Sequence, residues 1–92
     1  MNVLLAGPEG MLPGRFIVDT GTPRTIVDAT VMGDLGYPPE ATRRRANLLG
    51  AGGALPGYLV DIERLETMGL VFRGFEVVCQ PLPRELAVDG LI

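Results

Sequence analysis

The chain has 92 residues, of which 47% are apolar and 21% charged, and its formal net charge is −3. This length and composition are typical of one soluble globular domain, and the negative charge argues against nucleic acid as a partner. No apolar run approaches the roughly 18 residues of a membrane span. The start of the chain, "MNVLLAGPEG", lacks the basic residues and the long apolar stretch of a signal peptide, so the sequence leaves the compartment unknown.

Several residue types are missing altogether, because the sequence contains no His, Ser, Lys or Trp. These absences exclude Ser-His and Cys-His nucleophilic catalysis, Schiff-base chemistry on lysine and histidine-ligated zinc. The one cysteine, Cys79, cannot form an internal disulfide, and its place in the β-branched run "FEVVCQ" predicts a buried structural thiol. Any chemistry must therefore depend on carboxylates, backbone groups and water.

Thirteen glycines and eight prolines punctuate short β-type runs, which predicts a compact all-β domain with tight turns. We expect an opening strand at Asn2–Ala6, closed by the turn-like "GPEG", and a second strand at Arg15–Val18. The short β-branched run Thr25–Val27 should resume the strand after an intervening turn.

One short helix is expected near Ala29–Leu35. Asp28 is a suitable N-cap, and Gly36 offers a left-handed stop before two prolines. Gly33 weakens this helix because glycine has a low helix propensity.

Two hairpins are expected next. Residues 42–49 and 54–65 flank "GAGG", Gly50–Gly53, where glycine permits positive φ and an unencumbered tip. The runs "GLVFRG" and "FEVVCQ" predict a second hairpin around Arg73–Gly74. We interpret the basic spot Arg43–Arg45 as a solvated strand face rather than a phosphate site.

The stretch "FIVDTGTPRTIV", residues 16–27, ends an apolar strand with Asp19 and continues into a Thr-Gly turn. A carboxylate at the end of an apolar strand is poorly solvated, which favours sharing a proton with a second carboxylate. Thr20 can form a hydrogen bond to a neighbouring loop, Gly21 permits the turn, and Thr22 can donate a hydrogen bond to Asp19. The alternative is that Asp19 is an ordinary turn residue.

This stretch resembles the catalytic loop of the pepsin and retropepsin aspartic proteases, whose signature is apolar-apolar-Asp-Thr/Ser-Gly. The later "DGLI", Asp89–Ile92, resembles the apolar-apolar-Gly element behind that loop. Order and spacing are most similar to the single-domain, retropepsin-like bacterial aspartyl proteases, from about Val3 to Ile92. The resemblance implies one domain over residues 1–92, folded as a closed or partly open β-barrel.

The resemblance also implies the chemistry, in which two aspartates share one proton and activate a water. Because the chain holds one Asp-Thr-Gly, the second Asp19 would come from a second copy in a homodimer. Thr20, Gly21 and Thr22 would support the catalytic loop. The hairpin tip, made of Gly50, Ala51, Gly52 and Gly53, would be a flap over a peptide or protein substrate, with no metal and no organic cofactor.

Two departures from the family pattern leave an alternative open. The pattern continues with a Gly, a helix and further sheet where this chain reaches Ile92, so we expect a domain that is truncated at its C-terminus. Viral retropepsins carry another Asp after Asp-Thr-Gly-Ala, where Arg24 follows Thr-Pro here. The alternative function is a catalytically silent module that dimerises or binds a peptide strand, and the alternative for the glycine-rich tip is a plain hairpin turn.

Overall fold

The computed structural model describes residues 1–18, 24–42, 44–50 and 53–92, and strands account for most of them. The strands are β1 Asn2–Gly7, β2 Gly10–Ile17, β3 Ile26–Asp28, β4 Arg45–Gly50, β5 Gly53–Thr67, β6 Leu70–Gln80 and β7 Gly90–Leu91. The helix α1 spans Ala29–Asp34, and two short 3₁₀ turns cover Pro39–Ala41 and Arg84–Leu86.

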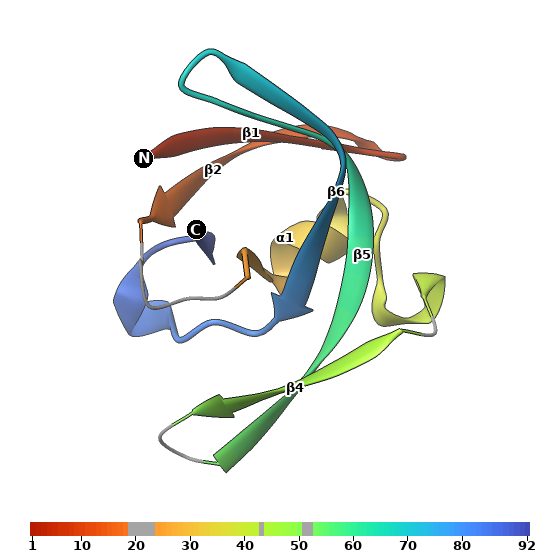
Figure 1. Ribbon diagram of the computed structural model, residues 1–92, viewed down its shortest axis with the longest axis vertical. Helices are drawn as coiled ribbons and strands as arrows, with labels where there is room; N and C mark the ends of the chain where they lie inside the picture. Colours follow the sequence, from red (N-terminus) through yellow and green to blue (C-terminus); the bar gives the residue numbers. More distant parts are fainter. Residues whose placement is uncertain (19–23, 43, 51–52) are drawn as a thin grey trace.

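Six of the strands close into a barrel (Figure 1). Hydrogen-bonded neighbours follow the order β1-β2-β7-β3-β6-β5-β4, and β1 also pairs with β5, which closes the ring and leaves β4 outside it. The β2–β7 and β3–β6 pairs are parallel, so the barrel is mixed. The all-β barrel with one short helix that the sequence predicts is confirmed.

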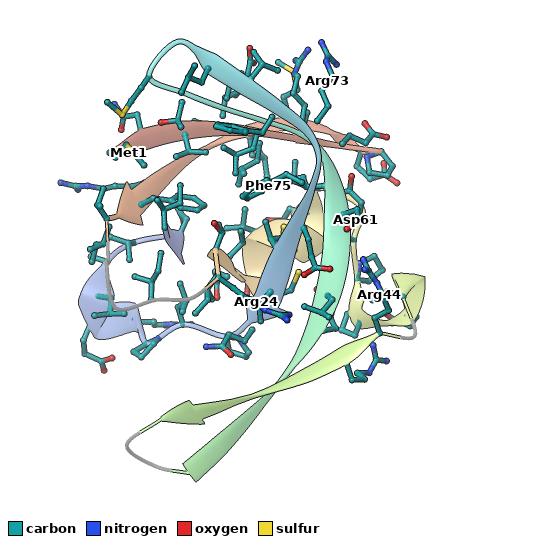
Figure 2. All side chains as sticks on the ribbon, viewed as in Figure 1. Met1, Arg24, Arg44, Asp61, Arg73 and Phe75 are labelled. Carbon is teal, nitrogen blue, oxygen red and sulfur yellow. The ribbon has the colours of Figure 1, made fainter. Side chains whose placement is uncertain are left out.

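The barrel interior is filled by apolar side chains, as the alternation along the strands requires (Figure 2). Its fully buried members are Leu5, Phe16, Val27, Met32, Leu35, Ile62, Leu65, Val77 and Cys79, whereas Val78 is buried on the opposite face of β6. They come from five strands and from the segment of α1, so no single hairpin could form this core alone.

The helix α1 appears where the sequence predicts it and ends as predicted. Gly36 follows it with φ of 97°, a left-handed conformation that glycine adopts without steric cost. Two tyrosines then attach the segment after the helix to β5. The Tyr58 hydroxyl donates a 2.7 Å hydrogen bond to the carbonyl of Tyr37, and the Glu63 N–H donates a 2.9 Å bond to the Tyr37 hydroxyl. Burial raises the pKa of Tyr58 to about 12, so its hydroxyl stays a donor at neutral pH.

The hairpin predicted around Arg73–Gly74 is wrong. Both runs belong to one strand, β6, which pairs with β5 along its length. The chain turns instead at Met68 and Gly69, both with positive φ, 51° and 77°. Gly74 also has positive φ, 59°, but there it only distorts the strand, because β5 continues to supply partners on both sides of it.

The second strand is longer than predicted, because β2 begins at Gly10 rather than at Arg15. Pro13 lies inside it, opposite Leu4 of β1. Within the described part of the chain, β7 pairs with β2 only at Phe16 and Ile17, so Pro13 lies at a free edge. A missing backbone N–H is tolerated at such an edge.

Candidate functional site

The predicted catalytic residues, Asp19, Thr20, Gly21 and Thr22, lie outside the described residues, as do Ala51 and Gly52 of the predicted flap. The structure instead describes the residues on either side of them. Val18 and Arg24 bound the segment that contains Asp19, and Gly50 and Gly53 form the last backbone pair of the β4–β5 hairpin.

The strand β7 lies between the two strands that lead into and out of the Asp19 segment (Figure 1). Phe16 and Ile17 of β2 pair with Gly90 and Leu91, and the same two β7 residues pair with β3 on their other side. The Ile92 N–H also donates a 2.9 Å hydrogen bond to the Ile17 carbonyl. Both ends of the Asp19 segment are therefore held by one short buried strand.

Gly90 lies where β7 passes between β2 and β3, and we call this place the β7 crossing. Glycine is required there because its neighbours leave no room for a side chain. A Cβ atom added there would lie 2.5 Å from the Ile26 carbonyl oxygen and would also overlap the ring of Phe16. The aromatic ring thus packs directly on the glycine, and the two flanking strands approach β7 at backbone distance. This explains why the predicted "DGLI" element contains a glycine.

Asp89 directly precedes β7 and attaches it to Arg15 of β2. Its carboxylate accepts a 2.8 Å hydrogen bond from the Arg15 N–H, and its own N–H donates a 2.7 Å bond to the Arg15 carbonyl. Its carbonyl accepts a 2.7 Å bond from the Asp28 N–H. This residue therefore connects the strand before the Asp19 segment with the strand after it.

The strand β3, which follows the Asp19 segment, is also attached to β6. Ile26 of β3 pairs with Val78 in parallel register, and the Val78 N–H donates a 2.9 Å hydrogen bond to the carbonyl of Thr25. Asp28 stands at the N-cap position of α1, but the predicted cap is wrong, because its side chain makes no cap hydrogen bond. Its carboxylate accepts instead a 3.0 Å bond from the Leu82 N–H, which ties the later loop to this strand.

The β4–β5 hairpin projects from the barrel (Figure 1, green). Its antiparallel register runs from Arg45 opposite Tyr58 to Gly50 opposite Gly53. The hairpin thus has the glycine-rich tip that the sequence predicts, at the end of a two-stranded arm.

A family model for aspartyl proteases matches residues 3–92 of the chain. The chain belongs to the aspartyl protease family. No curated protein matches it significantly. The match spans the barrel, the β7 crossing and the projecting hairpin, so the family relationship covers every element described above.

Three of the four aspartates outside the Asp-Thr-Gly motif have structural partners. Asp28 and Asp89 accept backbone hydrogen bonds, and Asp61 forms an ion pair with Arg44. Asp34 is exposed at the end of α1. Hydrogen bonds or an ion pair therefore engage three of these four carboxylates.

Large apolar side chains are exposed beside the entrance to the Asp19 segment. Val18 is 62% exposed, and it lines an apolar groove of about 340 Å³. Other apolar members of the groove are Met68, Leu70, Phe72, Phe75 and Ile92. Contiguous apolar surface of this kind typically marks an interaction site.

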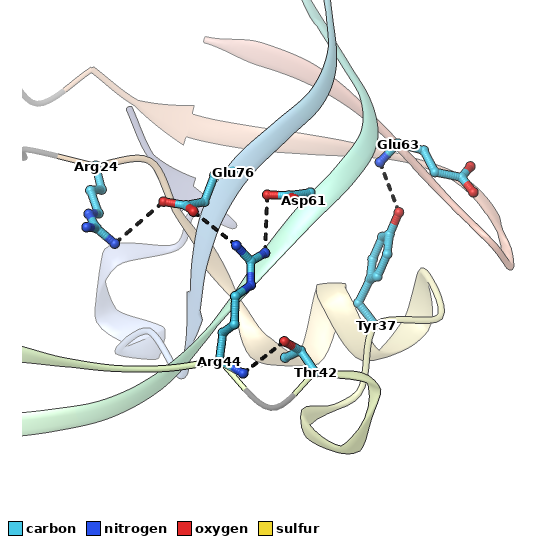
Figure 3. Close-up of polar contacts among 7 residues, drawn as sticks. All are labelled: Arg24, Tyr37, Thr42, Arg44, Asp61, Glu63 and Glu76. Atoms are coloured by element: carbon cyan, nitrogen blue, oxygen red, sulfur yellow. Dashed lines mark hydrogen bonds and ion pairs between the residues drawn. The ribbon is translucent and has the colours of Figure 1, made fainter.

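The chain also has an ion-pair network that the sequence did not indicate (Figure 3). Arg24, directly after the undescribed segment, approaches Glu76 of β6, and Glu76 also pairs with Arg44 at the base of the hairpin. Asp61 of β5 completes the network through Arg44. Charge alternation cannot reveal such pairs in a sequence, because the partners come from four separate segments.

Cys79 is fully buried, as the sequence predicts for a structural thiol, and burial raises its pKa to about 12. The thiolate that would act as a nucleophile is therefore not populated at neutral pH. Across the described residues, no three His, Cys, Asp or Glu side chains come together as metal ligands, and no helix is long and apolar enough to cross a membrane.

Proposed function

We propose that the chain is an aspartic endopeptidase that works as a homodimer, with Asp19 of each copy supplying one catalytic carboxylate. The observation that carries this proposal is the β7 crossing, where Gly90 and Leu91 pair with both strands that flank the Asp-Thr-Gly segment. A segment fixed at both ends can hold a carboxylate in a defined position, which catalysis by positioned groups requires.

In the proposed reaction, the two Asp19 carboxyl groups lie about 3 Å apart and share one proton, because two like charges at that distance cannot both ionise. The ionised group accepts a proton from a bound water, whose oxygen attacks the carbonyl carbon of the peptide. The protonated group donates its proton to the carbonyl oxygen. The tetrahedral gem-diol then collapses: the ionised carboxylate accepts a proton from one of its hydroxyl groups, the C–N bond breaks, and the leaving nitrogen takes the proton of the other carboxyl group. The dyad again holds one proton.

The residues after Asp19 support the carboxylate in this proposal. The Thr20 hydroxyl bonds to the partner's loop across the two-fold axis, Gly21 lets the backbone approach the carboxylate, and Thr22 donates to its outer oxygen. The tip Gly50, Ala51, Gly52 and Gly53 closes over an extended peptide as a flap.

Two observations support a dimer. The chain holds one Asp-Thr-Gly, and three of its other four aspartates are engaged by structural partners. Ile17 and Val18, the residues directly before Asp19, are 39% and 62% exposed in the single chain. A second copy that places its own Asp19 nearby would also cover these apolar side chains, which is favourable in water.

The test is Asp19→Asn, with Asp34→Asn as the matched control on an exposed aspartate. The amide keeps the shape but removes both the base and the shareable proton, so peptide cleavage should fall by about 10²- to 10⁴-fold or more. Circular dichroism should show the same fold in both variants. Cleavage at an unchanged rate by Asp19→Asn would contradict the proposal, and a folded wild-type dimer without any cleavage would favour the silent module.

The homodimer is tested by mixing. A roughly ninefold excess of Asp19→Asn chains at exchange equilibrium leaves about a tenth of wild-type chains paired with each other, so their activity should fall about tenfold. Activity should also rise with the square of protomer concentration below the dimer dissociation constant. Full activity per wild-type chain in the mixture would contradict a shared site.

A further inference from the structure

The ion-pair network lies where the β4–β5 hairpin leaves the barrel (Figure 3). The guanidinium of Arg44 uses both terminal nitrogens: Nη1 lies 3.2 Å from Oε2 of Glu76, and Nη2 lies 3.2 Å from Oδ1 of Asp61. The second oxygen of Glu76, Oε1, lies 3.6 Å from Nη1 of Arg24. Each of the two central residues therefore contacts two partners.

The two carboxylates in the network need Arg44 between them. Asp61 and Glu76 are directly opposite each other on the antiparallel strands β5 and β6. Like charges at such a cross-strand pair destabilise the sheet. Arg44 contacts both, so it converts a repulsive pair into an attractive group of three charges.

The backbone of Arg44 is held as well. Its N–H donates a 3.1 Å hydrogen bond to the Thr42 hydroxyl, and its carbonyl accepts a 3.1 Å bond from the Leu59 N–H. Arg44 directly precedes β4. Arg44 thus binds β5 through its backbone carbonyl and binds β5 and β6 through its side chain.

The other end of the network follows from the parallel register of β3 and β6. Ile26 pairs with Val78, so two residues earlier on each strand Arg24 comes beside Glu76. Arg24 is the first described residue after Thr22 and Pro23. The chain Arg24–Glu76–Arg44 therefore runs from the exit of the Asp-Thr-Gly segment to the base of the hairpin.

We propose that Glu76 and Arg44 are positioning residues that couple the hairpin to the Asp19 segment, so that the mobility of one depends on the other. The catalytic consequence rests on the proposed function, since it matters only if Asp19 reacts and the hairpin closes over a peptide. The coupling itself is a property of the fold. It is a salt-sensitive link, because all four side chains are about half exposed and their attraction is screened by ions.

We expect modest effects on hydrogen exchange, because each exposed ion pair contributes little to stability. Such pairs contribute more only when several share one fixed geometry. Loss of one link should increase local opening about two- to fivefold in the segment that it holds. An effect carried through Glu76 to the other end should be about twofold.

The test is amide hydrogen exchange on the Asp19→Asn background, which requires no activity. Arg24→Gln should accelerate exchange in residues 45–57, which Arg24 does not contact, and Arg44→Gln should accelerate it in residues 18–28. Both cross-effects should vanish when Glu76→Gln is also present. Glu66→Gln is the control, because it removes the carboxylate of another ion pair, the partly exposed Arg64–Glu66.

Three outcomes would overturn the coupling: variants that affect only their own segment, cross-effects that persist with Glu76→Gln, or an equal response to Glu66→Gln. The salt dependence of exchange provides a second test, which needs only one variant beside the wild type. Raising salt from about 0.02 M to about 1 M shortens the Debye length from roughly 20 Å to roughly 3 Å. Exchange should then accelerate in both segments of the wild type. In the Glu76→Gln variant residues 18–28 should not respond, because Arg24 has lost its partner, whereas the Arg44–Asp61 pair still makes the hairpin salt-sensitive. Equal acceleration of residues 18–28 in both proteins would overturn the proposal.

Steady-state kinetics provide a separate test of the catalytic consequence. With an active wild type, Glu76→Gln should raise KM and lower kcat about two- to fivefold, whereas Glu66→Gln should change neither. If exchange shows the coupling but the wild type cleaves no peptide, the proposed function fails and the coupling stands. If the wild type is active and exchange shows no cross-effect, only the coupling is overturned.

Discussion

The β7 crossing and the β4–β5 hairpin hold their residues in opposite ways. The crossing is buried and bonded through backbone on both sides of Gly90 and Leu91, with an aromatic ring packed on the glycine. The hairpin extends β5 beyond the closed ring, where only β4 pairs with it, and half-exposed ion pairs around Arg44 lie where it leaves the barrel. Burial makes the first region costly to change, whereas weak exposed contacts let the second open locally at lower cost.

The largest effect should follow from a side chain at the crossing. Gly90→Ala places a Cβ atom against the Ile26 carbonyl and the Phe16 ring, so the strands must separate. We expect a loss of about 3 kcal/mol of unfolding free energy, the upper end of overpacking costs. Urea unfolding followed by circular dichroism measures it.

Gly33→Ala is the matched control, because a Cβ atom added at Gly33 of α1 would meet no described atom within 4 Å. Alanine is the better helix former, so this variant should gain about 0.5 to 1 kcal/mol. Equal destabilisation by both changes would mean that the tight packing at Gly90 is not what stabilises the crossing.

A smaller effect, on dimer dissociation, is expected at Val18, the exposed residue that directly follows β2. Val18→Thr keeps the volume but adds a hydroxyl to the apolar groove, so it should weaken the proposed dimer about tenfold without unfolding the monomer. Val71→Thr is the control, since Val71 is also exposed but lines a different groove. Sedimentation across a dilution series measures both, and equal dissociation constants would place the interface elsewhere.

The smallest effect on stability should come from the hairpin tip. Replacing both Gly52 and Gly53 with Val disfavours positive φ and stiffens a tip that must open, so turnover should fall several-fold. The unfolding free energy should change by no more than about 0.5 kcal/mol, because the arm lies outside the barrel core. Lower stability with normal turnover would show that the hairpin is merely structural.

Local sequence patterns were enough to predict most elements. The runs at Asn2–Ala6 and Thr25–Val27, the helix near Ala29–Leu35 and the glycine-tipped hairpin all appear, because propensity, capping glycines and alternation act over a few residues. The fold class also followed, through the resemblance of the Asp-Thr-Gly and "DGLI" stretches to the family. The roles of Asp19 and of Thr20, Gly21 and Thr22 remain predictions.

Where two local signals predict different structures, tertiary contacts determine which of them forms. Gly69 and Gly74 both have positive φ, yet the chain turns at the first and continues as a strand through the second, because β5 supplies partners on both sides of Gly74. Asp28 has the sequence of a helix cap, but the nearby Leu82 N–H binds its carboxylate instead. Such outcomes depend on which groups are brought close in space, and a local pattern contains no information about them.

Local preferences indicate where strands, turns and the helix can form, because they arise within a few neighbouring residues. They did not determine the closure of β1 on β5, the place of β7 between β2 and β3, or the meeting of Arg24 with Glu76. Those contacts join residues far apart in the chain, and they are selected together by the burial of one shared core. The frame around the Asp19 segment is therefore a product of tertiary packing.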